Sequence, residues 1–402
     1  MNRPLCIYAG YLVRYPLGGH LLGEISNIVA LQRLGYDVIV VEESGGAWAP
    51  CYDAQRNEMT ADPSYGIACL QHLLRPHKLE RSWCYVDTNG YHGLSGGELR
   101  AACRKARFIF SRAGVTWLEE FRECNTRLYV DIDPGFTQFK MPATPVASCA
   151  GYASPYDFNY HFTIGERIGQ PDCPIPTHGL HWRRTRPPIA LDLAPVRFAP
   201  DAQRFTTVMS WTAYGSVEYR GVTYGQKNVE FLKLIELPRH AGPVFELALG
   251  GPDAPYDTLH EDGWHISGAL EATRTTADYL NYIGNSRGEF SVAKEGYVKT
   301  RCGWFSDRTA AYLASGKPAI VQDTGFSESL PCGEGLFAFK NVADIVDAIE
   351  KIGKDYQRHC AAARRIAEEY FDSEKILRAR LQACDLPVAT TRASRTSSGR
   401  SI

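Results

Sequence analysis

Cationic and hydroxyl side chains gather around one predicted helix start in the last third of the chain. Ser306 is a favoured N-cap residue, and Asp307 places negative charge in the first turn of the helix that it would open. Arg301 and Arg308 flank that start. Backbone N–H groups at a helix N-terminus attract anions, and guanidinium groups bind phosphate oxygens in pairs. This arrangement predicts a binding site for a diphosphate group.

A short apolar run follows this helix and ends in a polar turn. Gly316 is expected to end the helix, and residues 319–321 are typical of a buried parallel strand. Asp323 and Thr324 come directly after that strand. In open α/β sheets ligands bind outside the carboxyl ends of the strands, where a carboxylate and a hydroxyl can hold sugar hydroxyls. We therefore expect these two residues to contact a sugar or a ribose.

The stretch Thr-Arg-Cys-Gly-Trp-Phe-Ser, residues 300–306, resembles the Thr-His-Cys-Gly-Trp-Asn-Ser core of the plant-type nucleotide-sugar glycosyltransferase signature. The small-x-Gly-x-Pro motif and the Asp-containing loop that follow are similar too. In that family the His and the Ser contact the diphosphate, and the later Asp contacts the donor sugar. By position these roles fall on Arg301, Ser306 and Asp323, with Gly303 between the first two.

This chain departs from the signature at two positions. Arg301 replaces the His, which keeps a diphosphate contact possible. The Glu that usually holds the ribose is replaced by Thr309. Asp307 and Glu289 are the two candidates for that ribose contact.

The resemblance implies a GT-B-like α/β fold, with two doubly wound Rossmann-like domains that face each other across a cleft. It implies a glycosyltransferase, hexosyltransferase-like, that moves a sugar from a nucleotide-diphosphate-sugar donor to a hydroxyl acceptor. The donor is expected to be a UDP- or TDP-sugar, used as a co-substrate without a further cofactor. A nucleotide-sugar epimerase or hydrolase of the same fold and a non-catalytic nucleotide-sugar-binding protein stay open as alternatives. The sequence does not identify the acceptor, the sugar or the base.

Gly18, Gly19 and His20 lie between the first predicted strand and its helix. The glycines let the backbone approach a ligand, and the helix dipole disfavours an imidazolium at this place. A neutral imidazole is what a general base requires. In many inverting GT-B enzymes a His at this location deprotonates the acceptor, and His20 resembles it, which implies inversion. The alternative is that His20 only ends the loop with a local hydrogen bond.

Two further segments in the second half of the chain are candidates for donor contacts. Thr212 follows a predicted strand and Lys227 opens the next helix, and in GT-B folds this loop and a nearby cation often meet the diphosphate. A solvated surface lysine is the alternative reading of Lys227. Glu289 lies in a loop where retaining GT-B enzymes place the first of two Glu residues. The second position is Tyr297 here, which disfavours retention.

Asp131 and Asp133 occupy alternate positions at the end of a predicted strand and so face the same side. They could bind a divalent metal, or, like Glu24, orient His20. An Asp-Pro-Gly turn that caps the strand is the simpler interpretation. GT-B enzymes usually neutralise the leaving diphosphate with helix dipoles and basic side chains, so we expect no metal requirement.

The elements that must position these residues form two α/β halves. Prolines in residues 174–188 predict an interdomain linker, and the irregular region 47–97 is expected to shape an acceptor pocket. The predicted strands are 6–11, 38–41, 108–110, 128–130, 162–164, 205–211, 245–249, 290–293, 319–321 and 336–338. The predicted helices are 21–34, 117–124, 226–237, 269–282, 307–315, 342–352, 356–370 and 373–384. The expected parts are an acceptor-binding domain (1–185), a donor-binding domain (186–372), a helix crossing back to the first domain (373–386) and a disordered tail (387–402).

Composition limits the expected partners. The 402 residues carry a formal net charge of -1, with 44% apolar and 22% charged residues and no long basic run. This balance gives no electrostatic support for a nucleic-acid or membrane partner, so we expect neither, and a monomer or homodimer that binds a nucleotide-sugar and a small-molecule acceptor. No apolar run could span a bilayer and no signal peptide is evident, so a cytoplasmic location is expected. The twelve scattered cysteines indicate neither a zinc site nor disulfides.

Overall fold

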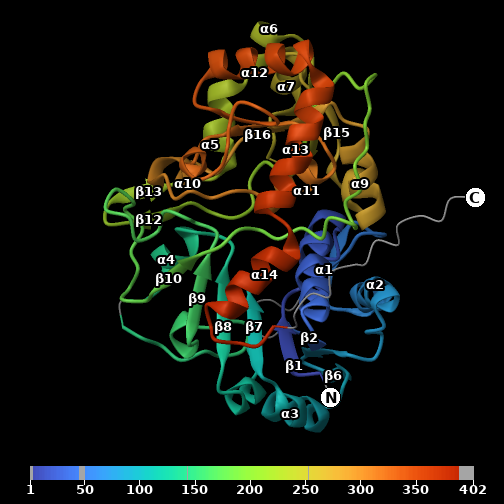
Figure 1. Ribbon diagram of the computed structural model, residues 1–402, viewed down its shortest axis with the longest axis vertical. Helices are drawn as coiled ribbons and strands as arrows, with labels where there is room; N and C mark the ends of the chain where they lie inside the picture. The colour runs from blue at the N-terminus through green and yellow to red at the C-terminus, as the bar shows by residue number, and fades with distance from the viewer. Residues whose placement is uncertain (1–2, 45–49, 143, 252, 389–402) are drawn as a thin grey trace, which may run out of the picture.

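The computed structural model describes residues 3–44, 50–142, 144–251 and 253–388, and its strands build two large sheets in two lobes (Figure 1). The first sheet has the order β10-β9-β8-β7-β1-β2-β5-β6, parallel except for β6. Its strands are β1 (Leu5–Ala9), β2 (Asp37–Glu43), β5 (Trp83–Asp87), β6 (Gly90–Gly93), β7 (Phe108–Arg112), β8 (Arg127–Asp131), β9 (Tyr160–Thr163) and β10 (Trp182–Arg184).

The second sheet is parallel throughout, with the order β15-β14-β11-β16-β17-β18. Its strands are β11 (Phe205–Ser210), β14 (Phe245–Gly250), β15 (His265–Gly268), β16 (Gly288–Ser291), β17 (Ala319–Gln322) and β18 (Leu336–Phe339). Two small hairpins stand outside the sheets: β3 (Cys51–Asp53) with β4 (Glu58–Thr60), and β12 (Val217–Tyr219) with β13 (Val222–Tyr224).

Helices cover both faces of each sheet, because side chains that alternate along a buried strand enter two different cores. In β1, Cys6 and Tyr8 join one core while Ile7 and Ala9 join the other. The first lobe contains α1 (Gly18–Arg33), α2 (Ser64–Leu74), α3 (Gly96–Lys105) and α4 (Phe136–Lys140). The expected α/β architecture with two doubly wound sheets is confirmed.

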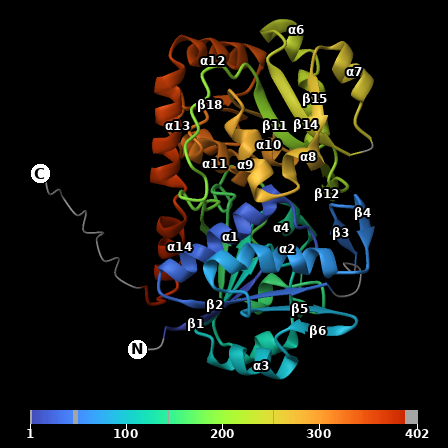
Figure 2. The ribbon, with the colours of Figure 1, turned by 90° about the vertical axis from the view of Figure 1, so that its right-hand side faces the viewer.

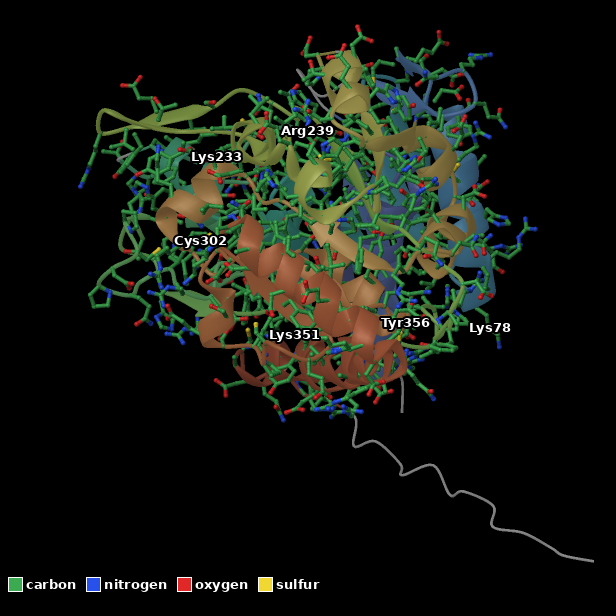
Figure 3. The ribbon with its side chains drawn as sticks, turned by 90° about the horizontal axis from the view of Figure 1, so that it is seen from above. Lys78, Lys233, Arg239, Cys302, Lys351 and Tyr356 are labelled. Carbon is green, nitrogen blue, oxygen red and sulfur yellow. The ribbon has the colours of Figure 1, made fainter. Side chains whose placement is uncertain are left out.

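The second sheet shows the same alternation, with Ile320 on one face and Ala319 and Val321 on the other. In the view from above, Lys233 and Arg239 mark the α5–α6 segment, and Lys351 and Tyr356 mark α12 and the start of α13 (Figure 3). The helices of this lobe are α5 (Lys227–Phe231), α6 (Leu237–Ala241), α7 (Tyr256–Glu261), α8 (Ala269–Thr273), α9 (Thr276–Gly284), α10 (Glu295–Thr300), α11 (Asp307–Ala314), α12 (Val342–Lys354) and α13 (Tyr356–Tyr370).

The chain crosses between the lobes twice, and the two crossings lie side by side. Ile189 donates its N–H to the carbonyl of Phe371, and its own carbonyl accepts the N–H of Ser373. The following helix, α14 (Ser373–Gln382), packs on α1 of the first lobe, where Leu377 and Leu381 are fully buried (Figure 1). Both crossings therefore form one hinge.

Several predicted boundaries are wrong for local reasons. Residues 174–188 contain the edge strand β10, because the stretch between Pro176 and Pro187 is free of proline. The helix predicted for 226–237 is interrupted before α6, which has Pro238 in its first turn. The helix predicted for 269–282 divides at Thr275, whose side chain caps α9. The helix predicted for 117–124 is a 3-10 segment, Glu119–Glu123. The sequence interpretation also missed α2 and β15.

The end of the described chain packs on the first lobe. The hydroxyl of Tyr36 donates to the carbonyl of Pro387. Most of the tail predicted to be disordered, from residue 389 onward, lies outside the described residues. Within the residues that are described, no helix has both the length and the apolar character needed to cross a membrane.

Candidate functional site

Charged side chains of both lobes meet where α1 faces the start of α11. Arg112, at the carboxyl end of β7, lies with its Nη1 2.5 Å from Oε1 of the fully buried Glu24 and its Nη2 3.4 Å from Oδ2 of Asp307. The other Glu24 oxygen accepts the hydroxyl of Tyr8 at 2.6 Å. Arg112 thus joins a carboxylate of its own lobe to one of the second lobe. We call the residues around this contact the interlobe cluster: His20, Glu24, Arg112, Lys227, Glu289, Asp307 and Arg308.

His20 is held at the start of α1 by its own lobe. Its Nε2 lies 2.5 Å from the carbonyl oxygen of Tyr11 and 3.5 Å from Oε1 of Glu24. Burial lowers the pKa of His20 below 6.5, although Glu24 acts in the opposite direction. The neutral ring donates its Nε2–H to Tyr11, so Nδ1 carries the free lone pair. Of the three carboxylates considered as partners, Glu24 is the one beside His20.

Arg308 is fixed by the second sheet at the start of α11. Its Nε donates to Oε1 of Glu289 at 2.7 Å, its Nη1 to the carbonyl of Val208 at 2.8 Å, and its Nη2 to Oγ of Ser291. Glu289 is fully buried, and its Oε2 has no hydrogen-bond partner among the described residues. Glu289 therefore holds Arg308, and its predicted contact with a donor or ribose stays a prediction.

Lys227 begins α5 and is partly buried beside Arg308. Its amine makes no hydrogen bond within the part of the chain that the structure describes. Burial lowers the pKa of Lys227 well below its usual value, and the positive charges of Arg308 and Lys294 lower it further, against the opposing effect of Glu289 and Asp307. An anion placed here would stabilise the charged amine, so this is the cation that a diphosphate would meet.

The predicted start of α11 is confirmed. Ser306 is the N-cap, and its Oγ accepts the N–H of Arg308 at 3.2 Å. Gly303 has a φ of 77°, and a Cβ there would lie 3.1 Å from the side chain of Arg167 in the first lobe. The N–H of Arg167 donates to the carbonyl of Cys302 at 2.9 Å. Gly303 therefore allows this loop to touch the first lobe, in the region marked by Cys302 in Figure 3.

The structure does not bring Arg301, Asp323 and Thr324 into the interlobe cluster. Arg301 is half exposed and pairs at 2.6 Å with Glu328, which also pairs with Arg167. Asp323 accepts the N–H of Gly325 and the hydroxyl of Ser327, both at 2.9 Å. The buried hydroxyl of Thr324 donates to the carbonyl of Trp304 at 2.6 Å. These side chains order their own loops, and their contacts with a donor stay predictions.

The predicted glycine loop lies against the second lobe. A Cβ on Gly18 would fall 2.0 Å from the carbonyl oxygen of Thr275, and one on Gly19 would fall 3.0 Å from the ring of Tyr279. The two glycines therefore permit a close approach between α1 and α9. Thr212 lies partly buried in the loop after β11. A phosphate contact of these three residues stays a prediction.

Sequence reasoning missed the second interlobe contact, which centres on Asp133. This carboxylate receives Nζ of Lys294 at 2.9 Å and the hydroxyls of Tyr214 and Tyr297. Its neighbour Asp131 is buried and accepts hydrogen bonds from Thr137, Gln138 and Thr163. Among the described residues, no group of three or more His, Cys, Asp or Glu side chains is arranged to hold a metal ion.

Arg112 was missed as well. An arginine at the carboxyl end of a central parallel strand was the available signal, because ligands collect at that edge.

A pocket of about 530 Å³ is lined by residues of α1, α2, the β3–β4 hairpin and the α8–α9 junction. Figure 2 shows that these elements of the two lobes are neighbours. The pocket has the size of a small-molecule site. Asp53, Arg56, Asp62 and Arg274 supply two negative and two positive charges to its wall. Pro16 and Leu21, which flank the first residues of α1, also line this pocket. His20, which lies between them in the chain, does not line it.

No family model and no curated protein matches this chain. Among solved structures, it is similar to an alpha-glucosyltransferase in complex with UDP and a 13-mer DNA containing a HMU base, with 9% identity, a TM-score of 0.57 and coverage of 95% of this chain and 99% of the other. An alpha-glucosyltransferase with UDP-glucose and DNA containing an abasic site has 8% identity, a TM-score of 0.57 and coverage of 95% and 98%. HepE of Anabaena, in complex with UDP and glucose, has 12% identity, a TM-score of 0.53 and coverage of 95% and 99%. The chain has the GT-B fold.

The comparisons correct one prediction. A nucleic-acid partner was excluded from the balanced net charge, yet two of these solved structures of the same fold contain DNA. Net charge is a sum over the whole molecule, whereas binding depends on the local distribution of charge, so it cannot exclude this class of partner.

Proposed function

We propose that this GT-B protein transfers a sugar from a nucleotide-diphosphate-sugar to a hydroxyl acceptor. The observation that carries the proposal is the position of Lys227, a cation without a hydrogen bond to any described residue, beside Arg308 and near Asp307. The negative charge of a diphosphate would stabilise the protonated form of this amine. The UDP and UDP-glucose held by the solved structures of this fold favour a UDP-sugar as the co-substrate.

The proposed step is a single displacement at the anomeric carbon. The acceptor oxygen bonds to that carbon, and the bond from the carbon to the phosphate oxygen breaks with its electron pair leaving on the diphosphate. Nδ1 of His20 takes the acceptor proton, since Nε2 is occupied by Tyr11. Lys227 and Arg308 stabilise the departing charge, without a metal ion in this proposal.

We place the acceptor in the pocket next to the glycine loop. Its wall belongs largely to the first lobe, and its charges balance, which suits a polar, uncharged hydroxyl compound. Pro16 and Leu21, which flank Gly18, Gly19 and His20 in the chain, line this pocket, so the proposal places the acceptor beside the start of α1.

Nucleotide release from UDP-glucose, with and without acceptors, tests the function. The acceptor panel contains small hydroxyl compounds and DNA containing an HMU base. We expect acceptor-dependent release of UDP and a glycosylated product. Release of nucleotide or isomerised sugar from the donor alone would identify the hydrolase or epimerase instead. UDP binding without turnover, and unaffected by loss of His20, would identify a binding protein.

The anomeric configuration of the product tests the stereochemistry. A single displacement with His20 as the base inverts the anomeric carbon, so an alpha-configured donor should give a beta-linked product by NMR. The description of the similar solved structures as alpha-glucosyltransferases makes retention the competing outcome. A retained configuration would remove His20 from the role of base.

A further inference from the structure

A second pocket, of about 510 Å³, lies where the chain crosses between the lobes. It is enclosed by the end of β9, by β10 and the segment that follows it, and by the α13–α14 junction. Figure 1 shows α14 crossing in front of the first sheet at this place. We call it the hinge pocket. None of its lining residues belongs to the interlobe cluster.

Positive charge is in excess in the hinge pocket. Five cationic residues line it, against the two acidic residues Glu166 and Glu369. Glu166 is already engaged by Arg186, at 2.5 and 3.1 Å. The remaining cations on the pocket side of β10 and on α14, with Glu369 as the other acidic residue of the lining, are Arg183, Lys375 and Arg380.

Arg380 is the buried member of this set, with 2% of its surface exposed. Its three nitrogens donate to neutral oxygens: Oγ1 of Thr185 at 2.6 Å, Oδ1 of Asn27 at 3.2 Å and the carbonyl of Arg186 at 2.7 Å. A guanidinium has five N–H groups, so two of them have no acceptor within the described residues. Burial lowers the pKa of Arg380 to about 9, Tyr8 acts in the opposite direction, and the positive charge of Arg112 lowers the pKa further. A buried charge without a counter-ion is costly.

Arg183 and Arg184 are consecutive residues of β10, so their side chains leave opposite faces of the strand, and Arg183 shares the face of Phe162, which lines the pocket. The guanidinium of Arg183 lies 5.2 Å from the ring centroid of Tyr160 and makes no ion pair among the described residues. Arg184 is exposed and has no ion pair or hydrogen bond to a described residue. Guanidinium groups with free N–H donors around a cavity match the oxygens of a phosphate, which they bind two at a time.

We propose that the hinge pocket binds a small phosphorylated anion, at a site separate from the interlobe cluster. The ligand binds beside Arg183 and supplies a negative charge next to Arg380. The volume of the pocket is that of a small-molecule site. This site is independent of the proposed transferase activity.

Calorimetric titration of the full chain with pyrophosphate tests the proposal. The titration uses the Lys227→Met variant, which weakens binding at the interlobe cluster and leaves the hinge pocket intact. We expect one saturable site, and we expect Arg183→Gln with Arg184→Gln to weaken it tenfold or more. Arg380 is left unchanged because its loss could unfold the chain. The matched control, Arg100→Gln with Arg104→Gln on α3, removes the same charge elsewhere and should leave the affinity unchanged.

The proposal would be overturned if Lys227→Met did not bind pyrophosphate. It would also be overturned if adding Arg183→Gln and Arg184→Gln left the affinity for pyrophosphate unchanged. Displacement of the bound pyrophosphate by duplex DNA at matched phosphate concentration would overturn the assignment to a small ligand. Absence of UDP binding at the interlobe cluster, with pyrophosphate still bound in the hinge pocket, would contradict the proposed function and support the hinge site.

Discussion

His20 combines two properties that a general base needs, a neutral ring and a free Nδ1. His20→Ala should lower kcat by about a hundredfold with little change in donor affinity. Steady-state kinetics and calorimetry with UDP measure the two effects. His240→Ala, at an exposed position of α6, is the control and should behave as wild type. Unchanged turnover in His20→Ala would exclude His20 as the base.

The pKa of His20 also predicts a pH dependence. Because the folded pKa lies below the unfolded value of about 6.5, the unfolded chain binds the proton more readily. The contribution of His20 to stability is therefore present above pH 6.5 and is lost as the pH falls toward the folded pKa. In the pH profile of kcat/KM, the fall on the acid side should lie below pH 6.5. This fall should be absent from the profile of His20→Gln.

Lys227 predicts proton uptake on nucleotide binding. Its lowered pKa leaves the amine partly deprotonated at alkaline pH, and a bound diphosphate raises that pKa again. Calorimetry of UDP binding at pH 8.5, in buffers of different ionisation enthalpy, should show protons taken up. Lys227→Met should abolish the uptake and weaken UDP about tenfold or more, near 1.4 kcal/mol. Lys351→Met, an exposed lysine on α12, should change neither quantity.

At the scale of elements, the Arg308–Glu289 pair joins α11 to the second sheet. Arg308→Met leaves a fully buried carboxylate unpaired and should lower the free energy of unfolding by about 3 kcal/mol. The double variant Arg308→Met, Glu289→Leu should recover most of that loss, because it removes both charges. Urea unfolding measures both variants.

The exposed pair Arg104–Glu123 provides the comparison for this experiment. Arg104→Met should leave the free energy of unfolding nearly unchanged, because solvent screens this pair. A double variant at Arg308 and Glu289 that is no more stable than Arg308→Met would contradict the pairing argument.

Local sequence signals predicted the elements that depend on local interactions. The Ser306 cap and the run of α13 were visible because capping and apolar periodicity act within one or two turns. The break between α8 and α9 was missed because it depends on the cap at Thr275. The edge strand β10 was missed because it occupies the short stretch between two groups of prolines. Arg112 could not be assigned, since its partners Glu24 and Asp307 meet only when the lobes pack together.

At the scale of the whole molecule, Asp133 holds the lobes together through Lys294, Tyr214 and Tyr297. Asp133→Ala removes the shared acceptor, so the nucleotide-free protein should open and its radius of gyration should increase. Small-angle X-ray scattering measures this change. Asp347→Ala, on the exposed side of α12, should leave the scattering unchanged. Identical profiles for Asp133→Ala and wild type would show that this contact does not set the lobe positions.

The packing of α14 against α1 has a consequence for the order in which the protein is made. Leu377 and Leu381 complete an apolar core whose other members belong mostly to the first lobe, from β1 to β9. A nascent polypeptide emerging from the ribosome has this surface of α1 uncovered until translation has nearly finished. The lobe that is synthesised first therefore has its core completed only when the last helix has been made.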